Sequence, residues 1–286
     1  MNCPQCDTFN PSTAQVCDCG YRFTDYEKQP KRKSPPQGFR PINRWLGAIF
    51  AVSSLTFLVL FFFKPSLPAR GEMLQSMFME PLQTEDAIPE SFEVTQKGLT
   101  YLIHPKFNYQ LNGLVVSTHA ADALSDVLHE QWQDYLNIMD MCVIWGPNLE
   151  NDAYQRIEFT SGNFTCYCRW FDELTGRQFK WDAISNNHLL TDDRRIAKRI
   201  RSVRPGDQVT MSGFLASYEN PAYGFKRGTS TTRTDTGNGA CETVYVTDFE
   251  IVKKGAPIRR FVKSTALLTM AISAIAFVAL PFLFRH

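Results

Sequence analysis

The uncharged stretch Trp45–Phe63, WLGAIFAVSSLTFLVLFFF, decides how the rest of the chain is organised. It contains no proline, and a helix of this length is about 28 Å long, which is close to the thickness of the hydrocarbon core of a bilayer. Lipid offers no hydrogen-bond partners to the backbone, so we expect this stretch to be a transmembrane helix. It separates a short, cysteine-rich head from a long domain of mixed composition.

A second uncharged run, Ser264–Phe284, predicts a second transmembrane helix. A domain over residues 64–260 therefore lies between the two spans. Basic residues precede both runs, within a Pro-rich linker over residues 25–44 and again within residues 253–263. The positive-inside rule places the N-terminus in the cytoplasm when it is applied to the first run, but it places the middle domain there when it is applied to the second.

The distribution of charge limits the kinds of partner. The formal net charge is only +1, yet residues 253–286 contain six Lys/Arg and no Asp/Glu, so the middle domain is acidic. Basic flanks suit the anionic head groups of a lipid bilayer. A nucleic-acid partner would need a basic surface, so we expect no nucleic acid to bind the middle domain.

The head, residues 1–24, contains two closely spaced cysteine pairs, Cys3 with Cys6 and Cys17 with Cys19. Two such pairs can surround one tetrahedral Zn²⁺ with four thiolates. A segment this short cannot bury a useful core, so metal binding would have to supply its folding free energy. Gly20 follows the second pair, where the turn needs a positive φ. A disulfide pair or a redox-active dithiol is the alternative interpretation.

The pattern CPxC…CxCGYxF of this head resembles the short zinc ribbons at the N-termini of many bacterial proteins. The resemblance implies a structural zinc ion and a protein partner for the head. Because the first helix usually sets orientation, we expect a bacterial inner-membrane protein with a cytoplasmic N-terminus and a periplasmic middle domain. In the alternative, the middle domain is cytoplasmic and one apolar run is re-entrant.

The middle domain predicts an α+β fold around a small, curved, mostly antiparallel sheet. Residues 101–105, 109–118, 141–145, 208–218 and 241–252 have the composition of strands. The turn residues 161–163 (SGN), between strand-like residues 154–160 and 164–170, predict a hairpin. Apolar spacing predicts helices over residues 120–139 and 192–203, the second with Thr191 as its N-cap. Gly213 lies in the middle of a strand, which often marks a bulge or a bend. The pattern GDxVxxxGxL there resembles an early strand of the OB-fold barrel.

Four cysteines of the middle domain, Cys142, Cys166, Cys168 and Cys241, lie in or beside predicted strands. Cys166 and Cys168 are two residues apart, so they share a face of one strand and do not easily bridge to each other. Each more readily pairs with Cys142 or Cys241. An oxidising compartment predicts two disulfides, while buried thiols or a second metal site are the alternatives in the cytoplasm.

The loop over residues 228–242, GTSTTRTDTGNGACE, is the best candidate for a binding segment. Arg233, Asp235 and Glu242 would present charge there, and His188 is the histidine best placed for a polar site. A catalytic interpretation makes Cys241 a nucleophile with a histidine as its base. A purely structural hairpin connection is the third possibility.

The segments CVIWGPN, RPGDQVTMSG and RTDTGNGACE resemble recurring segments of uncharacterised bacterial two-span membrane proteins, which brings no known activity. The chain contains none of the common catalytic or nucleotide-binding motifs. We therefore expect a non-enzymatic, membrane-anchored protein that binds a partner or ligand as a scaffold or sensor. The alternative is a membrane-bound hydrolase or thiol-dependent enzyme that uses the 228–242 loop.

Overall fold

The structure is a computed structural model that describes residues 1–23, 39–122, 126–235 and 240–283. The chain divides into two compact units, residues 1–61 with 263–286, and residues 62–262. Several predictions fall partly outside the described residues: the last residue of the head, the linker up to residue 38, residues 123–125 of the first predicted helix, residues 236–239 of the loop, and the last residue of the second span.

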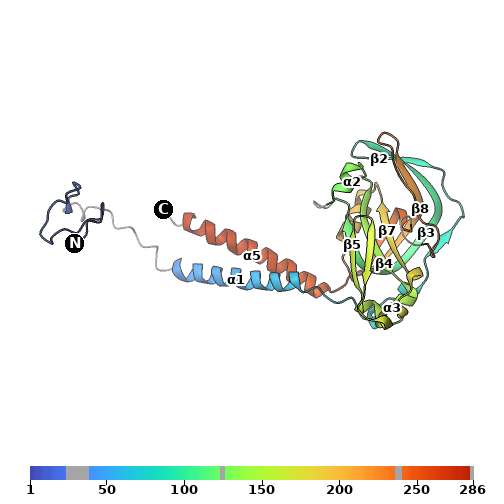
Figure 1. Ribbon diagram of the computed structural model, residues 1–286, viewed down its shortest axis with the longest axis horizontal. Coiled ribbons are helices and arrows are strands. Elements are labelled where there is room, and N and C mark those ends of the chain that lie inside the picture. The colour runs from blue at the N-terminus through green and yellow to red at the C-terminus, as the bar shows by residue number, and fades with distance from the viewer. Residues whose placement is uncertain (24–38, 123–125, 236–239, 284–286) are drawn as a thin grey trace. The chain divides into compact units, whose positions relative to one another are not determined.

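Two helices are long and apolar enough to cross a membrane, α1 (Phe39–Phe62) and α5 (Pro257–Leu283) (Figure 1). Their large apolar side chains are mostly exposed, as Leu55 is in α1, which suits a lipid environment. The Nζ of Lys263 in α5 lies 4.9 Å from the ring centre of Phe61 in α1. The helices therefore agree with the two predicted spans and indicate membrane association.

The middle unit is built around a closed ring of five strands. The order is β3, β4, β7, β10, β8 and back to β3, with β7 and β10 parallel and every other neighbouring pair antiparallel. This is the connectivity of the OB-like barrel, so the predicted fold class is confirmed. The strands of the sheet are β1 (Leu82–Thr84), β2 (Phe92–Gln96), β3 (Leu99–Ala120), β4 (Asn137–Ile144), β7 (Ile184–Leu190), β8 (Gln208–Asn220), β9 (Phe225–Arg227) and β10 (Glu242–Lys253).

Irregular positions let β3 and β8 curve enough to close the ring. The register of β3 against β8 shifts between Pro105 and Phe107, where a proline cannot donate to the ladder. The expected irregularity at Gly213 is present as well. A Cβ there would lie 2.0 Å from the carbonyl oxygen of Tyr245, beside a register shift of β10. Only glycine permits so close an approach between the two strands.

Strand β4 is buried on both faces because an insertion covers its outer side. Met141 and Val143 belong to the cluster inside the barrel, and Cys142 and Ile144 belong to a second cluster that the insertion covers. Within the insertion, β5 and β6 form a hairpin, as the sequence predicted. Its elements, with the short 3₁₀ turns before and after β4, are η2 (Arg70–Glu72), η3 (Gln75–Phe78), η4 (Gly146–Leu149), η5 (Asp152–Arg156), β5 (Glu158–Gly162), β6 (Thr165–Arg169), α3 (Glu173–Gln178) and η6 (Trp181–Ala183).

The prediction of one helix over residues 120–139 is wrong. Among the described residues of this range, only the five of α2 (Val127–Gln131) are helical, with Asp126 as the N-cap. The helix ends because Gln133 adopts a positive φ of 54°, and the chain then enters β4 at Asn137. Burial within the barrel outweighs the helical spacing of the apolar residues.

The second predicted helix is present as α4 (Arg194–Ser202). Its N-cap is Asp193 and not Thr191, because the Asp193 carboxylate accepts hydrogen bonds from the backbone N–H groups of Arg195 and Ile196. Ile196 and Ile200 pack into the barrel cluster, whereas Arg194 on the other side is exposed.

Candidate metal centre and binding cleft

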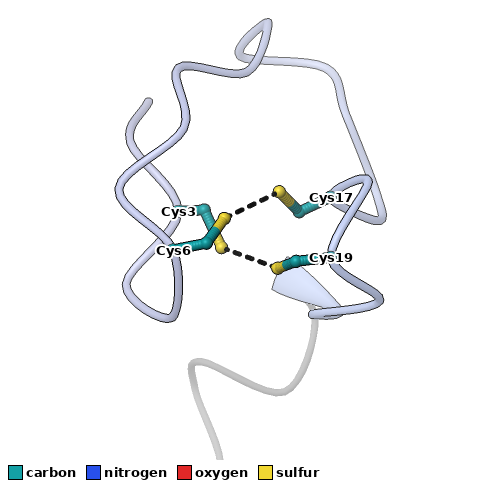
Figure 2. A group of neighbouring side chains, drawn as sticks. All are labelled: Cys3, Cys6, Cys17 and Cys19. Atoms are coloured by element: carbon teal, nitrogen blue, oxygen red, sulfur yellow. Dashed lines mark hydrogen bonds between the residues drawn. The ribbon is translucent and has the colours of Figure 1, made fainter.

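The four cysteines of the head come together as the sequence predicted. All four Sγ atoms lie within 4.8 Å of one another, with the closest approaches 3.5 Å between Cys3 and Cys19 and 3.6 Å between Cys6 and Cys17 (Figure 2). Four thiolates around a tetrahedral Zn²⁺ would be separated by roughly 3.8 Å, given a Zn–S bond of about 2.3 Å. The group can therefore hold a metal ion.

Backbone hydrogen bonds form the two turns that present these sulfurs. In the first turn, the N–H of Asp7 donates to the carbonyl of Cys3, and in the second, the N–H of Gly20 donates to that of Cys17. Gly20 adopts a φ of +87°, as expected for this position. The Asn10 side chain also donates to the Cys17 sulfur, 3.4 Å away, and so helps to orient it.

A cleft with a volume of about 1160 Å³ opens in the middle unit. Its floor includes Asn186 and His188 of β7. Its walls include Trp132 after α2, the β5–β6 turn with Phe164, Trp181 of η6, and residues 225–229 and 233–235 in and after β9. The two connections that follow β3 and β8 therefore meet over β7. In barrels of this connectivity, those connections and the face between them are where ligands bind.

A continuous series of hydrogen bonds runs beneath this cleft. Two buried aspartates, Asp126 and Asp140, each accept hydrogen bonds from histidine rings, and the amide of Asn137 donates both to Asp140 and to His129. Such a buried polar network holds its members in fixed orientations, although the Oδ1 of Asn137 has no partner among the described residues. The links, each between 2.5 and 2.9 Å, run from His119 through Asp126, His129, Asn137, Asp140 and His188 to Arg227.

The chemistry of Arg227 fixes the protonation of His188. A guanidinium only donates, so Arg227 donates to Nε2 of His188, and Nδ1–H of His188 donates to Asp140. Burial lowers the pKa of His188 and outweighs the attraction of Asp140, which favours this neutral ring. Burial alone would raise the pKa of Asp140, but the hydrogen bonds that its carboxylate accepts from His188 and Asn137 stabilise the charged form and lower the pKa to about 2.

The candidate residues of the loop form a second polar group beside the cleft. Arg233 and Asp235 line the cleft, as His188 does. Glu242 is buried and pairs with Arg233, with 2.6 Å between Nη1 and Oε1. Burial raises the pKa of Glu242 to about 7 and outweighs the attraction of Arg233. The structure therefore brings the predicted residues His188, Arg233 and Asp235 to one cleft. The fourth, Glu242, is buried behind Arg233.

Sequence reasoning missed several residues of the site. Arg227 and Asn186 carried no motif, and Trp132 was assigned to the face of a helix that does not form. Asp140 did carry a signal, because it is a charged residue within a buried strand, and a buried carboxylate needs hydrogen-bond donors.

One disulfide joins the barrel to the hairpin that covers it. Cys142 of β4 bonds to Cys166 of β6, while the Cys168 and Cys241 thiols are free among the described residues. The expectation of two disulfides is thus met by one. Cys168 shares its face of β6 with Cys166, since Tyr167 between them is exposed. Burial raises the pKa of Cys168 to about 12.

The geometry does not favour Cys241 as a nucleophile. Burial raises the pKa of its thiol, whereas a reactive cysteine needs a lowered pKa. Both ring nitrogens of His188 are already engaged, with Asp140 and Arg227, so this histidine has no free nitrogen to take a proton from the thiol. Asp207 does not line the cleft and pairs with Arg260, 2.7 Å away.

Comparisons with known proteins add no relative: the chain matches no protein-family model, no curated protein and no solved structure.

Proposed function

We propose that this protein is a non-enzymatic, membrane-anchored binding protein. Helices α1 and α5 hold it in a bilayer, a structural zinc ion bound by the four head cysteines stabilises a cytoplasmic segment that recruits a protein partner, and the barrel binds a ligand outside the cytoplasm. The alternative in which the chain is an enzyme has less support, because His188 and Cys241 are not arranged for proton transfer.

The cleft is the observation that carries this proposal. Its volume of about 1160 Å³ is ample for a small molecule. Aromatic side chains form much of its wall, and buried polar groups form its floor, which is the usual composition of a ligand site. The pKa values of Asp140 and His188 are both perturbed, and perturbed pKa values beside a cleft are typical of functional sites.

A cleft-filling substitution tests the proposal. Gly228 lines the cleft, and a Cβ atom added there would meet nothing within 4 Å, so we expect Gly228→Trp to fold with its larger side chain in the cleft. Gly71→Trp is the matched control, because Gly71 is equally open and lies outside the cleft lining. Native mass spectrometry of protein isolated from membranes should detect bound ligand in the wild type and in Gly71→Trp but not in Gly228→Trp.

Absence of any bound molecule in the wild type, or the same bound molecule in Gly228→Trp, would contradict ligand binding in this cleft.

A further inference from the structure

Arg227, the last residue of β9, lines the cleft and forms no salt bridge with a carboxylate in the described part of the chain, although its charge attracts that of the buried Asp134. Among the described residues, its guanidinium makes no salt bridge, and its one hydrogen bond goes to the neutral ring of His188. The other two cations of the cleft are paired, Lys226 with Glu219 and Arg233 with Glu242. Asp182 and Asp235 also line the cleft, but no ion pair joins either of them to Arg227 in the described part of the chain.

The guanidinium of Arg227 is held in place before any ligand arrives. Its central carbon lies 4.0 Å from the ring centre of Phe164, a cation–π contact, and Phe164 in turn stacks on Trp132 with ring centres 5.2 Å apart. On the other side, the Asp140–His188 pair fixes the one nitrogen that His188 presents to Arg227. An arginine fixed on two sides loses little entropy when it binds.

Most donors of this guanidinium remain available. A guanidinium has about five N–H donors, and only one of the Arg227 nitrogens is engaged by His188. Arginine recognises carboxylates and phosphates because its planar fork offers two parallel hydrogen bonds. The cleft therefore offers a fixed, unpaired cation with the geometry that suits an oxyanion.

Two further features of the cleft indicate which other groups the ligand carries. Asn186 is 93% buried and lines the cleft, and its amide nitrogen donates to the carbonyl of Phe164, which leaves Oδ1 as a buried acceptor without a partner among the described residues. This oxygen has almost no accessible surface, so a ligand hydroxyl or amine satisfies it once the Asn186 side chain turns toward the cleft. Trp132 and Trp181 line the walls with 43% and 56% of their surface exposed, which suits stacking against a ring.

We propose that the cleft binds a ring-bearing small molecule that carries a carboxylate or phosphate, with Arg227 as the residue that binds the anion. This inference rests on the proposed function, since it names the ligand class of the same cleft. His188 and Asp140 are positioning residues, because they act through Arg227.

Titration calorimetry on the full-length protein in detergent tests the inference. The probes are phenyl phosphate and benzoate as ring-bearing oxyanions, with benzyl alcohol as the neutral counterpart. The wild type should bind both oxyanions at least tenfold more tightly than benzyl alcohol. Arg227→Gln should weaken phenyl phosphate binding about 10- to 100-fold, which is the range expected for a charge-assisted contact. The affinity for benzyl alcohol should not change.

Arg194→Gln is the matched control, since it removes one arginine charge from the exposed side of α4 and should leave binding unchanged. Arg227→Lys keeps the charge and should bind phenyl phosphate more tightly than Arg227→Gln. If Arg227→Gln does not fold, Arg227→Lys and the salt dependence of the wild type decide, because binding to a cation weakens as ionic strength rises.

Equal affinity for phenyl phosphate and benzyl alcohol, no loss in Arg227→Gln, an equal loss in Arg194→Gln, or no binding of either oxyanion would overturn the inference. The proposed function has a separate test. If Gly228→Trp expels the natural ligand while Arg227→Gln retains it, the cleft binds a ligand but Arg227 does not select an anion.

Discussion

The buried carboxyl of Glu242 makes the stability of the protein depend on pH in an unusual direction. Its pKa is raised from 4.5 to about 7 in the folded protein, chiefly because only 3% of the residue is exposed. Between these two pH values the folded state holds a proton that the unfolded state has released. By linkage, the stabilisation is fully present below pH 4.5 and is lost as the pH rises through about 7.

The size of the effect follows from the shift of the pKa. A displacement from 4.5 to about 7 corresponds to about 3 kcal/mol of unfolding free energy. Glu242→Gln removes the titration but keeps a similar shape. Relative to the wild type, this variant should therefore gain about 3 kcal/mol between pH 4.5 and pH 7.5. Glu250→Gln, an exposed position on the same strand, should not change the pH dependence.

Urea unfolding of the full-length protein in detergent, followed by tryptophan fluorescence at pH 4.5, 6.0 and 7.5, measures this difference. Parallel pH profiles for the wild type and Glu242→Gln would refute the reasoning. So would a wild type that gains stability relative to the variant as pH rises, because that is the behaviour of a carboxylate whose arginine partner outweighs its burial.

Three further predictions concern the head, the disulfide and the closure of the barrel. Cys17→Ser should lower the zinc content of the purified protein from about one equivalent to near zero, whereas Ser12→Ala should leave it unchanged. Equal zinc content in the two variants would rule out the four-cysteine site. Reduction of the Cys142–Cys166 disulfide, which joins residues 24 apart, should lower the unfolding free energy by about 3 kcal/mol. Cys168→Ser should not lower it under oxidising conditions. An unchanged urea midpoint on reduction would contradict this prediction. Gly213→Ala should lower the unfolding free energy by about 2 kcal/mol or more, because its Cβ would lie 2.0 Å from the carbonyl oxygen of Tyr245. Gly71→Ala, whose Cβ would meet nothing within 4 Å, should lower it by less than about 1 kcal/mol. Equal unfolding free energies would show that the strands can move apart freely.

The sequence was sufficient for features that depend on local pattern. The two long helices follow from uncharged runs, and the four-cysteine group follows from the spacing of Cys3, Cys6, Cys17 and Cys19. The bend at Gly213 and the β5–β6 hairpin follow from single glycines and turn residues. In each case, the physical cause lies within a few residues of the signal.

The cleft could not be predicted because its residues are distant in sequence. Arg227 is recognised as a site residue only by its contacts with His188 and Phe164, and nothing near Arg227 in the sequence indicates these contacts. The helical spacing of residues 120–139 was misleading for a related reason. Leu136, Ile138 and Met139 are buried against strands from elsewhere in the chain, and such burial outweighs local propensity.

Thiol accessibility from each side of the membrane tests the central claim most directly. Ser12→Cys in the head and Thr247→Cys on β10 both introduce a cysteine at an exposed position, with the wild type giving the background from native thiols. A membrane-impermeant maleimide should label Thr247→Cys in intact spheroplasts and Ser12→Cys only after permeabilisation. Labelling of Ser12→Cys in intact spheroplasts, or of Thr247→Cys only after permeabilisation, would contradict a cytoplasmic head joined through the bilayer to a binding domain outside it.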